Sequence, residues 1–108
     1  MNPLTQLPGN VPIYEAIEEL MARDEEFLFA YFDLSHFKPF NDYYGYARGD
    51  EIIRWLAELA VQHCSLSQDF VGHIGGDDFV VLFCSQDWEM RCQRSLQAFA
   101  SGVTRFYD

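Results

Sequence analysis

The spacing of apolar residues along the chain predicts an alternation of helices and strands. Residues 11–22 carry apolar side chains at steps of three and four with glutamates between them, which is typical of an amphipathic helix. Asn10 stands directly before this segment, where we expect it to cap the helix. Residues 27–32 form a continuous apolar and aromatic run that ends at Asp33. Such a run predicts a strand that is buried on both faces.

The rest of the chain alternates in the same way. Residues 34–46 mix aromatic and polar side chains around Pro39 and Gly45, and we predict a loop there with at most one helical turn. Residues 47–63 have one apolar face and predict a helix. Two apolar runs, 70–74 and 79–83, flank a glycine-rich turn and predict a β-hairpin. After Ser85 or Asp87 as a cap, a last helix is predicted, with an apolar face that we expect in the core: Trp88, Cys92, Leu96, Phe99 and Val103.

This order of elements predicts an α/β (α+β) fold in a single domain over residues 1–108. Strand, helix, hairpin and helix are the first five pieces of a ferredoxin-like β-α-β-β-α-β unit, here preceded by an N-terminal helix. The closing strand is missing, because the residues after Val103 are too few to form it. Its absence would leave the strand at 27–32 with an unpaired edge, so we expect dimerisation or aggregation.

Composition and charge exclude several classes of protein. Hydrophobic residues make up 49% of the chain and aromatic residues 17%, which excludes a disordered segment. Seven basic against seventeen acidic residues give a formal charge of −10, which opposes binding to a nucleic-acid backbone. No apolar run is long enough to span a membrane and no signal pattern opens the chain, so we expect a cytoplasmic domain.

The turn of the hairpin, Gly75-Gly76-Asp77-Asp78-Phe79, is the first candidate for chemistry. Two glycines let a ligand approach the backbone closely. Two adjacent carboxylates repel each other unless a cation lies between them, which favours a hard metal such as Mg²⁺. The alternative is an ordinary exposed turn, since Gly and Asp are common turn residues. Asp33 ends a strand where α/β sheets often place ligands, or it serves only as a structural cap.

Three motifs together resemble a known family, the GGDEF domains that act as diguanylate cyclases. The turn is similar to the family's signature loop, with Asp in place of Glu at its fourth position. Residues 4–10 resemble the opening motif, and residues 33–50 resemble the strand-end and guanine-binding segment, in the same order and spacing. The resemblance covers essentially the whole chain and implies a nucleotidyl-cyclase palm-like core that lacks its C-terminal part. Residues 38–46 look most like GGDEF domains linked to EAL and CBS domains.

The resemblance implies that two GTP molecules, each held by one protomer of a homodimer, condense to cyclic di-GMP with the help of Mg²⁺ or Mn²⁺. Carried over position by position, it implies the following roles: metal binding by Asp33, the Leu34 carbonyl, Asp77 and Asp78; catalysis by Asp77, Asp78 and Lys38; phosphate contacts by the backbone of Gly75, Gly76, His36 and Phe37; and guanine recognition by Asn41 and Asp50. Taken alone, Lys38 would be a solvated lysine, Asn41 a turn residue and Asp50 a helix-start carboxylate.

Departures from the family pattern keep a second function open. His73 stands where the family usually has Arg, and an imidazole does not reproduce a permanent planar cation. Ser35 replaces the second acid of the strand-end motif. The product-inhibition motif would fall on residues 66–69, where Asp69 is present but Leu66 replaces Arg, so we predict no tight product inhibition. The alternatives are a GTP-binding regulatory domain that controls a linked EAL phosphodiesterase without turnover, and a structural fragment that binds no ligand.

Overall fold

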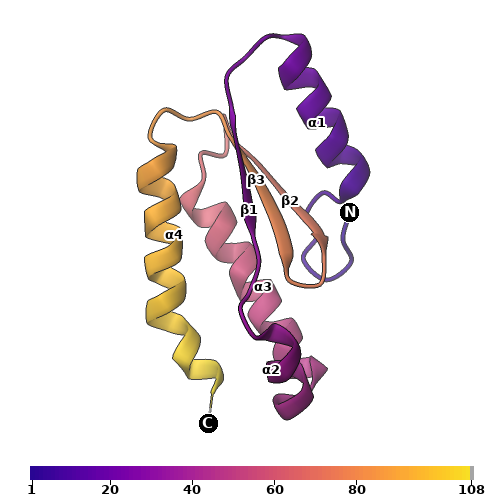
Figure 1. Ribbon diagram of the computed structural model, residues 1–108, viewed down its shortest axis with the longest axis vertical. Helices are drawn as coiled ribbons and strands as arrows, with labels where there is room; N and C mark the ends of the chain where they lie inside the picture. Colours follow the sequence, from indigo (N-terminus) through magenta and orange to yellow (C-terminus); the bar gives the residue numbers. More distant parts are fainter. Residues whose placement is uncertain (108) are drawn as a thin grey trace.

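The computed structural model describes residues 1–107 and confirms the predicted order of helices and strands (Figure 1). Its elements are α1 (Asn10–Ala22), β1 (Leu28–Phe32), α2 (Phe37–Tyr44), α3 (Tyr46–His63), β2 (Phe70–Gly75), β3 (Asp78–Phe83), α4 (Trp88–Gly102) and the 3-10 turn η1 (Val103–Phe106). The chain therefore forms a mixed α/β domain in which a hairpin lies between two long helices.

The strands form an antiparallel sheet in the order β1-β3-β2. Strand β3 lies in the middle and pairs Phe79 with Phe32 of β1, while the hairpin pairs Gly75 with Asp78. Within residues 1–107, no strand pairs with the outer edge of β1. The unpaired edge predicted from the ferredoxin-like plan is therefore present.

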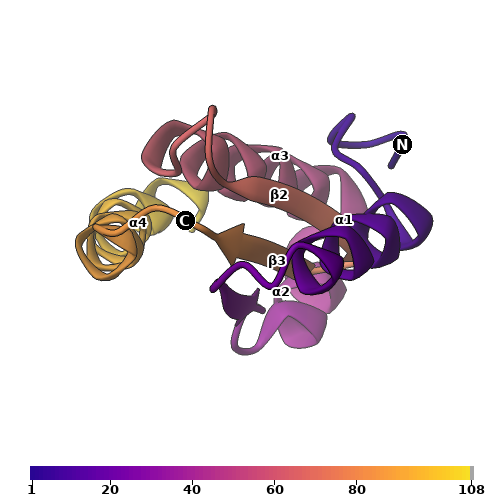
Figure 2. The same ribbon diagram turned by 90° about the horizontal axis from the view of Figure 1, so that it is seen from above.

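The core has two layers because the side chains of β3 alternate between the faces of the sheet. Phe79, Val81 and Phe83 pack toward α3, while Val80 and Leu82 pack toward α1. All five are almost completely buried. Figure 2 shows α1 and α4 on opposite sides of the molecule, with the sheet between them. Strand β3 is thus covered on both faces, and its fixed position also fixes the glycine turn that precedes it.

The prediction that the first strand is buried on both faces was wrong. Phe29 and Tyr31 are 49% and 52% exposed, whereas their neighbours in β1 are half-buried. Phe29 lies opposite Leu82 and Tyr31 opposite Val80, so they share the sheet face that α1 covers over β3. Helix α1 packs on β2 and β3 and leaves β1 uncovered. A continuous apolar run therefore marks an edge strand here, because one of its faces lacks a covering helix.

Two local predictions at helix starts were also wrong. Residues 37–44 were expected to form a loop and instead form α2. Pro39 is its third residue, where its missing N–H costs no hydrogen bond, and Gly45, with φ +92°, ends the helix. Asn10 lies inside α1 rather than before it, and Gly9 takes the N-cap position.

Helix α4 is less buried than its apolar spacing predicted. None of its described residues is buried, and Leu96 is 56% exposed. The helix leans on α3, where Phe99 stacks on Trp55 with ring centroids 5.3 Å apart. At its start, the Asp87 carboxylate accepts a hydrogen bond from Arg91 Nε at 2.8 Å instead of capping the backbone. On the apolar face of α4 that was expected in the core, Phe99 therefore packs on α3 while Leu96 stays exposed.

The free edge leads to a first prediction, that the 108-residue chain self-associates through β1. Light scattering at rising concentration is expected to show species larger than a monomer, and Phe29→Lys is expected to shift the distribution toward the monomer, because a lysine on an edge strand opposes pairing with another chain. As a control, Tyr14→Lys replaces an even more exposed aromatic on α1 and should change nothing. A monodisperse monomer for the unmodified chain would contradict the prediction.

Candidate functional site

Three carboxylates meet where β1 ends and β3 begins. Phe32 pairs with Phe79, so the antiparallel register places the residue after β1 beside the residues before Phe79. As a result, one carboxylate oxygen from each of Asp33, Asp77 and Asp78 lies within 4.8 Å of the others. Asp33 is exposed and the other two are half-buried. A compact set of oxygen donors of this kind suits Mg²⁺ or Mn²⁺.

The surroundings fix and polarise this cluster. The Leu34 backbone N–H donates a hydrogen bond to Asp77 Oδ2 at 2.9 Å, which holds that carboxylate against the end of β1. The structure thus places Leu34 beside the cluster through its amide. A hydrogen bond to the Asp78 side chain raises the pKa of Tyr31 above its ordinary value, and desolvation and the charges of the three aspartates act in the same direction. The negative field of the cluster therefore reaches the exposed face of β1.

A second feature lies on the other side of the glycine turn. Asn41 of α2 and Asp50 of α3 line one cavity of about 330 Å³, together with Phe37, Tyr46 and Gly76. Among the described residues, Asn41 Oδ1 is buried and has no hydrogen-bond partner. A buried polar atom without a partner is uncommon and costs stability. The cavity is therefore bordered by two polar residues, Asn41 and Asp50, and the Asn41 oxygen itself lies buried against Gly49.

A sharp corner brings Asn41 and Asp50 together. Gly45 ends α2 and stands directly before α3, and its φ of +92° makes the corner without the strain that a side chain would add there. Just beyond it, Gly49 lies so close to α2 that a β-carbon at this position would overlap Asn41 Oδ1. The absence of a side chain at Gly49 is what lets the Asn41 amide occupy its place on the cavity wall.

The glycine turn lies between the carboxylates and the cavity. Gly76 has φ +51° and lines the cavity, and nothing lies within 4 Å of a β-carbon built on either Gly75 or Gly76. The space over the turn is therefore open. Phe37 begins α2 and lines the same cavity, and the first amides of a helix have no carbonyl partner in the preceding turn. Such amides favour an anion.

The side chains of two predicted site residues, His36 and Lys38, lie elsewhere. His36, with φ +61°, precedes α2, and its side chain borders a separate hollow walled by Phe40, Tyr43, Tyr44 and Tyr107. Lys38 is largely exposed, and its ammonium lies 3.7 Å from the Asp42 carboxylate one turn along α2. Neither side chain belongs to the carboxylate cluster or to the cavity that Asn41 lines.

Comparison with known proteins shows which family combines these features. The family model described as "Diguanylate cyclase, GGDEF domain" matches residues 1–105. The chain belongs to the GGDEF family. The carboxylate cluster and the cavity beside the glycine turn are therefore features of a GGDEF domain of cyclic di-GMP signalling.

Individual relatives support the same assignment. The diguanylate cyclase DgcP of Pseudomonas aeruginosa is 34% identical over 85 residues, which are 75% of this chain and 12% of that protein. The cyclic di-GMP phosphodiesterase PdeR of Escherichia coli is 30% identical over 102 residues, which are 93% of this chain and 14% of that protein. The chain thus spans a small part of these relatives.

The fold agrees with solved structures. A structure of TpbB (YfiN) from Pseudomonas aeruginosa that comprises only the GGDEF domain matches with a TM-score of 0.77 at 24% identity. The match covers 92% of this chain and 62% of that one. At this identity the likeness shows the fold alone. No helix in the described part of the chain is both long enough and apolar enough to cross a membrane.

Asp69, in the segment where the resemblance would put a product-inhibition motif, is engaged by internal contacts. Asp69 Oδ1 accepts hydrogen bonds from the backbone N–H groups of Cys84 and Ser85 at 2.8 and 2.9 Å. Asp69 Oδ2 accepts from the Ser65 N–H at 2.7 Å and from the Ser85 hydroxyl at 2.9 Å. With four donors on one carboxylate, Asp69 ties the end of α3 to the end of β3. It is a structural residue in this GGDEF domain.

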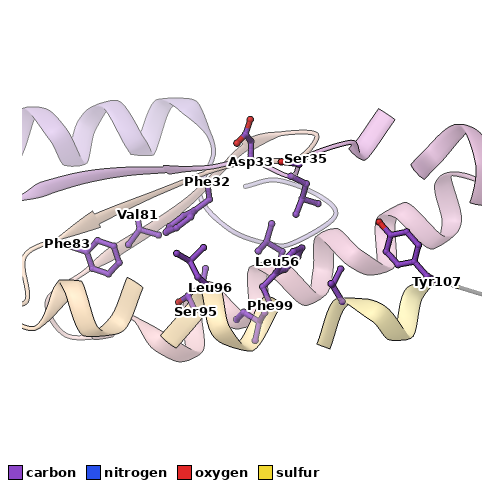
Figure 3. Close-up of a pocket in the computed structure, with 14 residues that line it drawn as sticks. Phe32, Asp33, Ser35, Leu56, Val81, Phe83, Ser95, Leu96, Phe99 and Tyr107 are labelled. Atoms are coloured by element: carbon purple, nitrogen blue, oxygen red, sulfur yellow. The ribbon is translucent and has the colours of Figure 1, made fainter. Parts of the chain in front are cut away.

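An apolar cavity of about 290 Å³ lies next to this site, under the end of β1 and between α3 and α4. Figure 3 shows Phe32, Leu56, Leu96 and Phe99 around it, and it shows the Asp33 carboxylate pointing away from it. The lining of this cavity is mostly apolar. Asp33 therefore belongs to the carboxylate cluster, although its backbone also borders this cavity.

The sequence analysis assigned no site contact to several residues that lie around the site. Tyr46 borders the cavity of Asn41, and Thr5 and His73 contact each other beside the glycine turn. The apolar spacing of residues 47–63 predicted a helix starting one residue after Tyr46. The contact between Thr5 and His73 joins residues far apart in the chain, which periodicity does not detect.

Proposed function

We propose that this GGDEF domain binds GTP together with Mg²⁺ or Mn²⁺ at the glycine turn. The observation that carries the proposal is the turn itself, because Asp77 and Asp78 belong to the carboxylate cluster while Gly76 lines the cavity that Asn41 and Asp50 border. A nucleotide lying across the turn would place its phosphates near the metal site and its base in the cavity. The carboxylates would then have a cation beside them, and the polar residues of the cavity would have hydrogen-bond partners on the base.

The metal would be held by Asp33, Asp77 and Asp78, with the Leu34 carbonyl as a further oxygen donor. Three carboxylates give a strongly negative site that suits a divalent cation and repels a bare triphosphate. When bound, the cation neutralises triphosphate charge and lowers the pKa of an attacking hydroxyl. The negative charge of the whole chain makes this neutralisation essential for binding an anionic nucleotide.

The chain's own groups would bind the rest of the nucleotide. The amides of Gly75 and Gly76, and those of His36 and Phe37 at the start of α2, would face the phosphates, with Lys38 moving from Asp42 toward them. The Asp50 carboxylate would accept hydrogen bonds from N1 and N2 of guanine, and the Asn41 amide would read another edge of the base. This donor and acceptor pattern favours guanine over adenine.

In the whole protein we propose synthesis of cyclic di-GMP by a homodimer in the cytoplasm. The 3′-hydroxyl oxygen of one GTP would form a bond to the α-phosphorus of the other, the bond from that phosphorus to the bridging oxygen would break, and pyrophosphate would leave. The hydroxyl proton would pass to solvent, and the step would occur twice. Asp77 and Asp78 would act as catalytic residues by holding the metal, and Lys38 by stabilising charge on the leaving phosphates.

We further propose that EAL and CBS domains are linked to this domain and that a further strand of the same polypeptide covers the open edge of β1. The free edge, the exposed Phe29 and the apolar cavity behind β1 all support a covering element. The alternative is a GTP-binding domain that regulates a linked EAL phosphodiesterase without turnover. An assay for cyclic di-GMP on a nucleotide-bound sample separates the two functions.

The cavity assignment predicts the effect of Gly49→Ala. Alanine normally stabilises a helix by roughly 1 kcal/mol relative to glycine, but its β-carbon would displace the Asn41 amide and also approach Phe37. We expect GTP affinity in the presence of Mg²⁺ to fall about tenfold, as for the loss of one or two hydrogen bonds. Calorimetric titration measures the affinity, and thermal melting checks the fold.

Gly9→Ala is the matched control for this substitution. Gly9 precedes α1, and nothing lies within 4 Å of a β-carbon built on it. We expect its GTP affinity to equal that of the unmodified chain. If Gly49→Ala binds GTP as tightly as Gly9→Ala, the base does not occupy the cavity that Asn41 lines.

A further inference from the structure

His73 is an almost completely buried polar residue with a fixed ring. It is 1% exposed, and its ring lies parallel to that of Phe79 at a centroid distance of 4.3 Å. Both ring nitrogens have a partner: Nε2 lies 2.9 Å from the Gly76 carbonyl oxygen, and Nδ1 lies 2.9 Å from Thr5 Oγ1. The histidine therefore connects the glycine turn with the N-terminal segment.

The partners determine the direction of the hydrogen bonds. A carbonyl oxygen only accepts, so His73 Nε2 carries the hydrogen and donates to Gly76. In the neutral ring, Nδ1 then accepts a hydrogen bond from the Thr5 hydroxyl. The same hydroxyl oxygen accepts a long hydrogen bond from the Leu7 N–H at 3.4 Å. Thr5, His73 and Gly76 thus form one continuous chain of hydrogen bonds.

Thr5 is itself held in a closed turn. Asn2 Oδ1 accepts from the N–H groups of Leu4 and Thr5 at 2.9 and 3.3 Å. The Asn2 N–H donates to the Leu7 carbonyl, and the Gln6 N–H donates to the Asn2 carbonyl, both at 2.8 Å. The His73 N–H donates to the Pro8 carbonyl, also at 2.8 Å. The N-terminal turn, residues 2–8, is therefore fastened to β2 by its backbone and by one side chain.

We infer that Thr5 and His73 are positioning residues that hold the glycine turn in its ligand-binding conformation. Gly76 is held at a positive φ, and its carbonyl is the acceptor of the only side-chain hydrogen bond found for it among the described residues. Fixing this carbonyl fixes the direction of the peptide unit that leads into Asp77. The N-terminal turn is in this way a structural part of the site, and the His73 imidazole is the group that connects it to the glycine turn.

The inference rests on the proposed function for its effect on GTP, but its structural part is independent of any nucleotide. Thr5→Val keeps the shape of the side chain and removes only the hydroxyl, whereas Thr5→Ser keeps the hydroxyl. In the nucleotide-free chain, amide hydrogen exchange in residues 75–78 is expected to be about tenfold faster in Thr5→Val, and Thr5→Ser is expected to restore the slower exchange. Gly9→Ala serves as a control outside the hydrogen-bond chain.

Binding gives the second readout. With Mg²⁺ present, GTP affinity is expected to fall about tenfold in Thr5→Val and to recover in Thr5→Ser, while the melting temperatures of the two variants stay alike. Equal exchange and equal affinity in both variants would overturn the inference, and so would a loss of melting temperature in Thr5→Val with unchanged affinity. If no variant binds GTP but the exchange difference remains, the proposed function fails and the positioning role stands.

Discussion

Replacing Asp33 by Asn is expected to weaken the binding of GTP in the presence of Mg²⁺ by about a hundredfold, which corresponds to about 2.7 kcal/mol. Asp33 is the exposed member of a cluster whose carboxylate oxygens lie within 4.8 Å of one another. Asn would offer the metal a neutral ligand in place of an anionic one, so the metal would bind more weakly. A more weakly bound metal would neutralise less of the triphosphate charge. Calorimetric titration with and without Mg²⁺ measures the effect.

The same substitution is expected to stabilise the metal-free chain. Like charges about 4 Å apart in water repel by about 1 kcal/mol, so the free energy of unfolding in a chelator should rise by roughly that amount. Glu18→Gln removes the same charge from the exposed face of α1 and serves as the control. An Asp33→Asn variant with unchanged Mg²⁺ dependence and unchanged stability would show that the cluster is an ordinary acidic turn.

Replacing Asp69 by Ala is expected to lower the free energy of unfolding by about 3 kcal/mol. Its carboxylate accepts four hydrogen bonds, among them two from the backbone of Cys84 and Ser85, and Ser85 is buried. Hydrogen bonds to a charged group are worth about 1.5–3 kcal/mol each, though they do not add fully, and the donors left behind would lack partners. Urea denaturation with an unchanged m-value measures the loss.

Gln68→Ala is the control for Asp69, because Gln68 makes only an exposed contact with the Ser65 hydroxyl. It should change stability by less than about 0.5 kcal/mol. The internal role of Asp69 also agrees with the absence of tight product inhibition expected from Leu66. A change below 1 kcal/mol for Asp69→Ala, or a complex with cyclic di-GMP at micromolar concentration through residues 66–69, would contradict this reading.

Local patterns predicted much of the fold. The hairpin was recognisable from two apolar runs around a glycine turn, and β2 and β3 lie where those runs predicted them. The helix at 47–63 was predicted to within one residue at its start. These elements have a strong period, and their boundaries coincide with glycine or polar residues.

Other features depended on contacts that a pattern does not contain. The two-sided burial expected for residues 27–32 failed because α1 covers β3 and not β1, a matter of how helices lie on the sheet. Helix α2 was missed because Pro39 suggested a break, although proline is compatible with a first helical turn. The first failure reflects contacts with residues far along the chain, whereas the second reflects a local misreading of where proline stands in a helix.

In the candidate site, too, some of the residues lie together and others lie apart. The chain brings the carboxylates of Asp33, Asp77 and Asp78 together and places Asn41 and Asp50 on one cavity, while the roles of these residues stay predictions. The two side chains at His36 and Lys38 lie outside both features in the nucleotide-free chain. The support that His73 gives was not predicted, because its partner Thr5 lies 68 residues away and the hydrogen bond depends on the fold.

If this chain carries a metal-dependent, guanine-selective nucleotide site, a calorimetric titration with GTP and with ATP, each in the presence and absence of Mg²⁺, will show it. We expect binding of GTP with Mg²⁺, at least tenfold weaker binding of ATP, and a large loss of GTP affinity without the metal. Equal binding of GTP and ATP, or no binding of GTP by the folded chain, would contradict it.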